Sequence, residues 1–250
     1  MLTVCSTRDP AIRLSFDDAL LAGLPPGGGL YQPCPAPELS DVIAGLPDEA
    51  PFVDLAATLT EALLADELDA GAATGAATCG SNADGAGRSR GHGDGAGPAH
   101  AAAREVAATA YPFAPALSWL ADDIALLELY HGPTCAFKDF GASFLATILE
   151  RRLGGEPGAG PVVVLVATSG DTGGAVARAF WRRAGIKVVL LYPSGRISRL
   201  QEQQLTALGD NIHAVEVAGS FDDCQRLVKQ ALIDRELVAA ARLCLSLIHI

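Results

Sequence analysis

The sequence predicts an α/β fold in which a parallel sheet carries helices on both faces. From residue 124 onward, strand-like and helix-like runs alternate along the chain. Alternation of this kind is typical of right-handed βαβ units. One of the strand-like runs, residues 162–167, is entirely apolar, which is typical of a strand buried on both faces. Because ligands of such sheets bind beyond the carboxyl ends of the strands, the loops there are the first candidates for a functional site.

The first 69 residues are predicted to form a folded N-terminal region. Ser15 and Asp18 have the spacing of a capping box ahead of a short helix, and Gly23 is expected to end that helix. Asp54 is placed to cap a second helix. The apolar face of that second helix consists of Leu55, Leu59 and Leu63.

Residues 70–104 differ from the rest of the chain in composition. Alanine and glycine dominate the segment and its apolar residues have no period. Such a sequence buries too little surface to offset the entropy of ordering it, so we expect a disordered insertion.

Residues 105–241 are predicted to form an α/β region. The expected strands are residues 124–130, 162–167, 187–193 and 212–217. Capping boxes are expected where Ser198 precedes Gln201 and where Ser220 precedes Asp223. The helices between the strands are expected to end at Gly154, Gly185 and Gly209.

Composition excludes several classes of protein. A net charge of -11 argues against a nucleic-acid surface, which needs clustered Lys and Arg. No run approaches the roughly 18 apolar residues of a membrane span, and the first 20 residues do not resemble a secretory signal. The six cysteines lack C-x-x-C spacing, so we expect free thiols in a reducing, cytoplasmic compartment and no metal site.

One lysine lies where a strand-like run turns into a helix. Lys138 follows the polar turn HGPTCAF and has two aromatic neighbours, Phe137 and Phe140. Burial or a neighbouring cation makes a lysine amine nucleophilic, as covalent chemistry on a carbonyl group requires. A lysine that begins a helix can equally be a solvated surface charge. Asp139 can be a salt-bridge partner or a helix N-terminal charge.

A glycine-containing loop, TSGDTGG at residues 168–174, follows the apolar strand 162–167. Glycines permit close approach of a ligand, and the start of the next helix offers N–H groups to an anion. Ser169 and Thr172 add hydroxyl donors for a carboxylate or phosphate. The loop is neither G-x-G-x-x-G nor a P-loop, and a purely structural capped turn stays open as an alternative.

Two further residues of the lysine turn invite catalytic interpretations. A single histidine in such a turn is more often a hydrogen-bonded structural residue, and we interpret His131 in that way. Cys135 has no identifiable base in the sequence, so we expect a small packing residue.

Several long segments together resemble the threonine synthase family, which has the tryptophan-synthase-β-like fold and uses pyridoxal 5′-phosphate. The matching segments are residues 5–33, 127–141, 168–180, 192–212 and 221–231. The resemblance implies that Lys138 carries the cofactor and that Asp171 contacts it. It also implies a substrate-binding set, which consists of Thr168, Ser169, Gly170 and Thr172. The implied reaction converts O-phospho-L-homoserine and water to L-threonine and phosphate.

The resemblance further implies a second large domain, whose glycine-rich loop binds the cofactor phosphate. We therefore expect this chain to be the N-terminal half of the enzyme, with residues 242–250 as a non-native tail. Expressed alone, such a half is expected to be inactive and poorly soluble; the whole enzyme is expected to be a monomer or homodimer. The alternatives are a threonine-synthase-like phospho-lyase, a truncated non-catalytic domain and a nucleotide-binding module.

Overall fold

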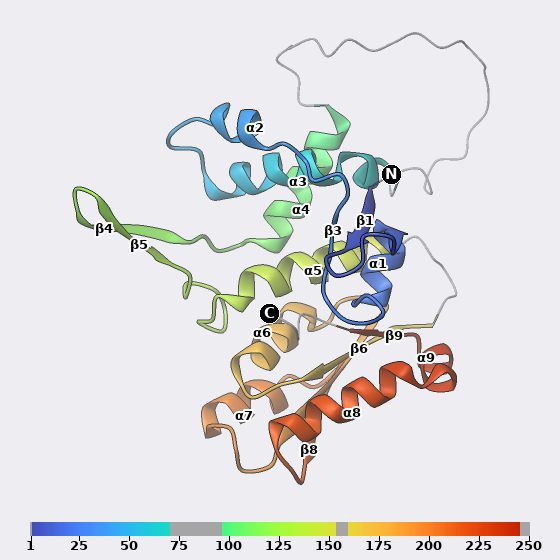
Figure 1. Cartoon of the computed structure of the whole chain (residues 1–250). Helices are drawn as coiled ribbons and strands as arrows, with labels where there is room; N and C mark the ends of the chain where they lie inside the picture. The colour runs from blue at the N-terminus through green and yellow to red at the C-terminus, as the bar shows by residue number, and fades with distance from the viewer. Residues whose placement is uncertain (1, 71–96, 154–159, 246–250) are drawn as a thin grey trace.

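The computed structural model describes residues 2–70, 97–153 and 160–245. Within that part of the chain, a four-stranded sheet has the order β8-β7-β6-β9, and every pair of neighbours is parallel (Figure 1). Its strands are β6 (Val162–Ala167), β7 (Ile186–Pro193), β8 (Ile212–Val217) and β9 (Leu243–Leu245). The predicted parallel sheet is thus confirmed, and β9 is a strand that the sequence did not predict.

Helices cover both faces of this sheet, as predicted. One face packs against α5 (Lys138–Leu153), α6 (Asp171–Phe180) and α7 (Arg199–Thr206). The other face packs against α8 (Phe221–Ile233), which α9 (Arg235–Ala241) follows. Alternate residues of β6 supply the two cores, since Val164 and Val166 face α5 and α6 while Leu165 and Ala167 face α8.

Around the parallel sheet, the starts of α7 and α8 were predicted more accurately than the ends of α6 and α7. Ser198 and Ser220 both form complete capping boxes at the starts of α7 and α8. The helices α6 and α7 end at Phe180 and Thr206, a few residues before the glycines that were predicted to end them. Gly185 and Gly209 lie in the following turns with φ of 71° and 63°, a conformation that glycine adopts without strain.

The N-terminal region forms a small antiparallel sheet with helices around it. Its elements are β1 (Thr3–Ser6), β2 (Arg13–Ser15), α1 (Phe16–Ala22), β3 (Tyr31–Pro33), α2 (Ser40–Ala44) and α3 (Phe52–Ala70). Ser15 caps α1 and Gly23 ends it, as predicted. The predicted cap at Asp54 is wrong, because α3 already begins at Phe52. Asp54 lies in the first turn and accepts a hydrogen bond from Arg104 Nε over 3.0 Å.

The predicted insertion was too long at its C-terminal end. Residues 98–104, which were assigned to it, form the first half of α4 (Pro98–Ala110). Alanine is the best helix former, and the fully buried Ala103 and Ala107 let α4 pack closely against α3. The amino-acid composition suggested disorder because composition contains no information about which alanines are buried between helices. Residues 71–96 lie outside the described residues.

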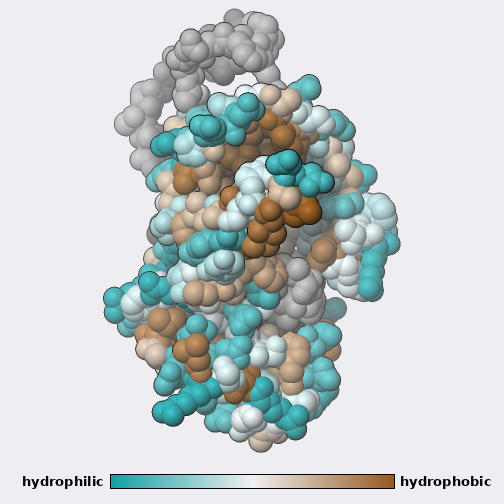
Figure 2. Space-filling view, turned by 90° about the vertical axis from the view of Figure 1, so that its left-hand side faces the viewer, coloured by the Kyte–Doolittle hydropathy of each residue, from teal (hydrophilic) through white to brown (hydrophobic). Residues whose placement is uncertain are grey.

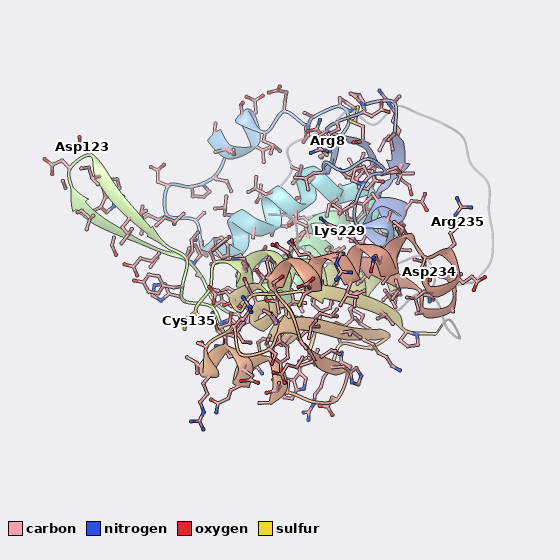
Figure 3. The ribbon with its side chains drawn as sticks, turned by 60° about the horizontal axis from the view of Figure 1, so that its bottom comes forward. Arg8, Asp123, Cys135, Lys229, Asp234 and Arg235 are labelled. Carbon is pink, nitrogen blue, oxygen red and sulfur yellow. The ribbon has the colours of Figure 1, made fainter. Side chains whose placement is uncertain are left out.

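The strand predicted at residues 124–130 exists but does not join the parallel sheet. β5 (Ile124–Glu128) pairs antiparallel with β4 (Ala116–Ala121), which the sequence did not predict. The two strands form a hairpin that projects from the body of the molecule, with Asp123 at its tip (Figures 1 and 3). The apolar run of β5 therefore does not indicate burial in a sheet core.

The end of the described chain is part of the fold. β9, which lies in the segment predicted to be a tail, pairs with β6 through Val164 and Cys244. Cys244 is buried, and burial raises the pKa of its thiol to about 12. Among the described residues, no helix is both long and apolar enough to cross a membrane.

Candidate active site

Lys138 is the first residue of α5 and lines a cavity of about 310 Å³. The Nζ atom lies 4.2 Å from the centroid of the Phe137 ring, close enough for a cation–π contact. The remaining lining is mainly apolar and comes from two helices and the loop after β5. It consists of Leu129, Phe137, Phe140, Gly141, Ala142, Thr172 and Val176.

The turn before Lys138 is held by Asp139. This residue lies in the first turn of α5, as one of the two sequence interpretations has it, and its side chain is buried. Its carboxylate accepts hydrogen bonds from Thr134 N over 2.9 Å and from Thr134 Oγ1 over 2.6 Å. A Cβ at Gly132 would lie 2.6 Å from that of Asp139, so glycine is needed there. The carboxylate thus fixes the turn that presents Lys138.

An aromatic cluster supports α5 from the side of the N-terminal helices. Phe140, which lines the cavity, contacts Phe52, Tyr111 and Phe113 with ring centroids 5.0–6.0 Å apart. Tyr111 also stacks on Phe144, one turn further along α5. Burial raises the pKa of Tyr111 to about 12. The cluster anchors the first two turns of α5, and with them the base of Lys138.

A second carboxylate lies at the base of the hairpin. Glu128 accepts hydrogen bonds from Ser118 Oγ over 2.6 Å and Tyr130 Oη over 2.8 Å, and His131 Nε2 lies 2.8 Å away. These contacts lower the pKa of Glu128 to about 2. The structural interpretation of His131 is therefore confirmed. The interpretation of Cys135 is wrong, because it is exposed in the turn with φ of 58° (Figure 3).

The loop after β6 is organised around a buried hydroxyl. Thr168 Oγ1 accepts hydrogen bonds from Gly170 N over 3.0 Å and from Gly173 N over 2.8 Å. Gly173 leaves no room for a larger residue, since a Cβ there would lie 2.5 Å from Thr168 Cγ2. Thr168 therefore shapes the loop from within.

The remaining loop residues lie nearer the surface. Ser169 and Asp171 are exposed, and Asp171 Oδ1 accepts a hydrogen bond from Gln201 Nε2 over 2.8 Å. Thr172 is half-buried in the first turn of α6 and faces the Lys138 cavity.

Of the predicted site residues, the structure brings Lys138 and Thr172 to one cavity. Thr168 is buried inside the loop, whereas Ser169 and Asp171 are exposed and do not line the cavity. The sequence did not predict the hydrogen bonds of Glu128 at the base of the hairpin or the hydrogen bond of Gln201 to the loop residue Asp171. The capping-box position of Gln201 was recognised, but only the three-dimensional structure shows that its amide also reaches Asp171.

Residues 106–243 match a protein-family model described as "Pyridoxal-phosphate dependent enzyme". The chain belongs to this family. Residues 3–73 also match a model described as "Threonine synthase N terminus". The matched range contains Lys138 and the loop 168–174, and pyridoxal phosphate is the cofactor of this family.

Threonine synthases are prominent among the similar proteins. The chain is 37% identical to that of Serratia marcescens over 236 residues, which cover 94% of this chain and 47% of the relative. The crystal structure of the Escherichia coli enzyme matches with a TM-score of 0.73 and 36% identity, over 97% of this chain and 49% of that one. A PLP-bound threonine synthase from Brucella melitensis matches with a TM-score of 0.74 and 32% identity, over 98% and 47%. The chain thus spans about half the length of these relatives.

The residues around the cavity fit pyridoxal phosphate. A primary amine, which can bond to the cofactor's aldehyde, lines a mainly apolar cavity together with the aromatic side chains of Phe137 and Phe140. The cavity volume lies at the lower end of the range of about 300–1,000 Å³ for ligand pockets. Thr172 adds a hydroxyl group to the lining.

Proposed function

We propose that this chain supplies the cofactor lysine and the substrate loop of a threonine synthase. The proposed reaction converts O-phospho-L-homoserine and water to L-threonine and phosphate. The observation that carries the proposal is the shared cavity, which is lined by Lys138 from α5 and by Thr172 from the loop after β6. The similarity to threonine synthases along nearly the whole chain supports the choice of reaction.

Each part of the site has a task in this proposal. Lys138 holds the cofactor and, when its amine is free, moves protons to and from the substrate carbons. Bound pyridoxal phosphate supplies an electron sink for the substrate. Ser169 and Thr172 are proposed to bind the substrate carboxylate through their hydroxyls, because hydroxyl donors at a helix start suit an anion. Gly170 is proposed to contribute through the loop conformation, because its N–H donates to Thr168 Oγ1.

Asp171 is proposed to lie on the cofactor side of the loop. Its contact with Gln201 holds its carboxylate at the start of α6, where the helix dipole stabilises a negative charge. Thr168 is proposed to act on the substrate chiefly through the loop conformation, because its hydroxyl is already bonded to Gly170 and Gly173.

We also propose a cytoplasmic location and a monomeric or homodimeric enzyme. The described cysteines are all free thiols, which supports a reducing compartment. They are Cys5, Cys34, Cys135, Cys224 and Cys244.

A hybrid enzyme tests the proposed reaction. Residues 2–245 of this chain would be joined to the part of E. coli threonine synthase that the chain does not match, with a Lys138→Arg hybrid and a Lys187→Arg hybrid as controls. The proposal predicts that the parent and the Lys187→Arg hybrids form L-threonine from O-phospho-L-homoserine, and that the Lys138→Arg hybrid does not.

Product analysis separates the proposal from its nearest alternative. Release of phosphate with a keto acid in place of L-threonine would favour a phospho-lyase. A soluble hybrid that binds pyridoxal phosphate and releases no phosphate from O-phospho-L-homoserine would contradict both functions.

A further inference from the structure

Gln201 links the starts of the two helices that follow β6 and β7. Its Nε2 donates to Asp171 Oδ1 over 2.8 Å, and its Oε1 accepts from Ser198 N over 3.1 Å. We propose that Gln201 is a positioning residue, which sets the orientation of loop 168–174 toward the Lys138 cavity. This inference rests on the proposed function, because it concerns the same loop.

Both ends of the Gln201 amide are fixed by their partners. A carboxylate only accepts hydrogen bonds, so the NH₂ group must face Asp171. The backbone N–H of Ser198 needs an acceptor, so the amide oxygen must face α7. One side chain therefore completes the capping box of α7 and also holds the first residue of α6.

Gly170 shows how closely the amide approaches the loop. Its φ is 141°, and a Cβ at this position would overlap the Gln201 side chain, 2.5 Å from Cδ. The amide thus fills the space beside Gly170, while Thr168 Oγ1 accepts from Gly170 N on the inner side. The loop is fastened from within by Thr168 and from outside by Gln201. Thr172 lies beyond these contacts and faces the cavity.

The substitution Gln201→Glu separates the two roles of this residue. Glutamate keeps an oxygen for Ser198 N and completes a capping box well, so α7 retains its cap. It cannot donate to Asp171, and it places a second carboxylate against the first. The double substitution Gln201→Glu with Asp171→Asn reverses donor and acceptor and can restore the bond.

Hydrogen exchange of individual amides in the hybrid enzyme, without cofactor, provides the measurement. The hydrogen-bonded amides of Gly170, Gly173 and Gly174 report on the loop, and the amide of Glu202 reports on α7. We expect Gln201→Glu to accelerate exchange of the three loop amides about tenfold, as loss of a charge-assisted bond implies. Exchange at Glu202 should not change, and the double variant should return the loop to within about twofold of the parent.

Two further variants serve as a matched control and as an independent test. Gln203→Glu makes the same change at an exposed position of α7 and should leave the loop unchanged. Asp171→Leu removes the acceptor and leaves the α7 cap intact, so it should accelerate the same loop amides even if Gln201→Glu unfolds the chain.

Unchanged loop exchange in both Gln201→Glu and Asp171→Leu would overturn the proposal. So would acceleration in Gln201→Glu that the double variant does not reverse, because Gln201 would then not act through Asp171. Neither result depends on cofactor bonding to Lys138. A failure of this inference is therefore distinguishable from a failure of the proposed function.

Discussion

The loop that follows β6 and the segment that follows the β4–β5 hairpin line the same cavity, but the chain supports the loop and the hairpin very differently. Loop 168–174 is tied to its own buried Thr168, to Gln201 of α7 and to the ladder between β6 and β7. The hairpin of β4 and β5 is a two-stranded sheet whose large apolar side chains are mostly exposed, including Trp119 at 66% and Leu120 at 69%.

The exposed hairpin is visible from the side to which it projects. Figure 2 shows hydrophobic side chains on this face beside hydrophilic ones, and the exposed set at the hairpin is Leu117, Trp119, Leu120, Ile124, Leu126 and Leu127. Exposed apolar patches of this kind are typical of surfaces that contact another protein segment. The comparison teaches that the shape of the substrate loop is set by this chain's own core, whereas the hairpin is held mainly at its base.

The largest stability effect is expected at the turn that joins the hairpin to α5. Asp139→Ala leaves the N–H and hydroxyl of Thr134 without their acceptor, which we expect to cost about 3 kcal/mol. Urea denaturation measures this loss. Thr134→Ser, which keeps both donors, is the control, and an equal loss in that variant would show that Asp139 is not the essential acceptor.

In the loop after β6, removal of a single hydroxyl group should lower the free energy of unfolding. Thr168→Val keeps the shape of the side chain but removes the acceptor for Gly170 N and Gly173 N, at an expected cost of about 2 kcal/mol. Thr168→Ser should retain most of the stability in the same denaturation assay. If Thr168→Val is as stable as the parent, the loop is not organised by this hydroxyl.

The hairpin base should respond to acid. The hydrogen bonds from Ser118, Tyr130 and His131 hold the pKa of Glu128 near 2, below its ordinary value of 4.5. The contribution of the ionised Glu128 to the free energy of unfolding is therefore complete above about pH 4.5 and is lost as the pH falls toward 2. The NMR signal of the Trp119 indole should shift over this window in the parent but not in Glu128→Gln. The same shift in both proteins would assign the change to another group.

The smallest effect on stability is expected at the hairpin strands. Trp119→Ser and Leu120→Ser remove exposed side chains and should change the free energy of unfolding by less than about 0.5 kcal/mol. Self-association should nevertheless fall, which light scattering against concentration can measure. A large loss of stability would show that these side chains pack against the body in solution.

The same contrast explains what the sequence could predict. The apolar run of β6 and the Ser198 and Ser220 caps are local signals, and the structure confirms them. The strand at β5 was also recognised, but its antiparallel partner β4 was not. Exposed apolar residues in β4 carry no signal that distinguishes a hairpin from a buried strand.

Long-range contacts account for the rest. Helix α4 depends on alanines that are buried by packing against α3 and α5, and a composition rule therefore assigned part of it to an insertion. The contact between Gln201 and Asp171 spans 30 residues, and nothing in the capping pattern of α7 indicates it. The resemblance to a known family identified the candidate lysine and loop, but only the folded chain places Lys138 and Thr172 on one cavity.

The central claim is that Lys138 carries pyridoxal phosphate, and borohydride reduction tests it most directly. The part of the hybrid enzyme that comes from this chain contains three lysines, Lys138, Lys187 and Lys229, so peptide mapping can assign a reduced adduct among them. After incubation of the hybrid enzyme with pyridoxal phosphate, we predict the adduct on the peptide that contains Lys138, and its loss in the Lys138→Arg hybrid. An adduct confined to Lys187 or Lys229, with Lys138 unmodified, would contradict the account.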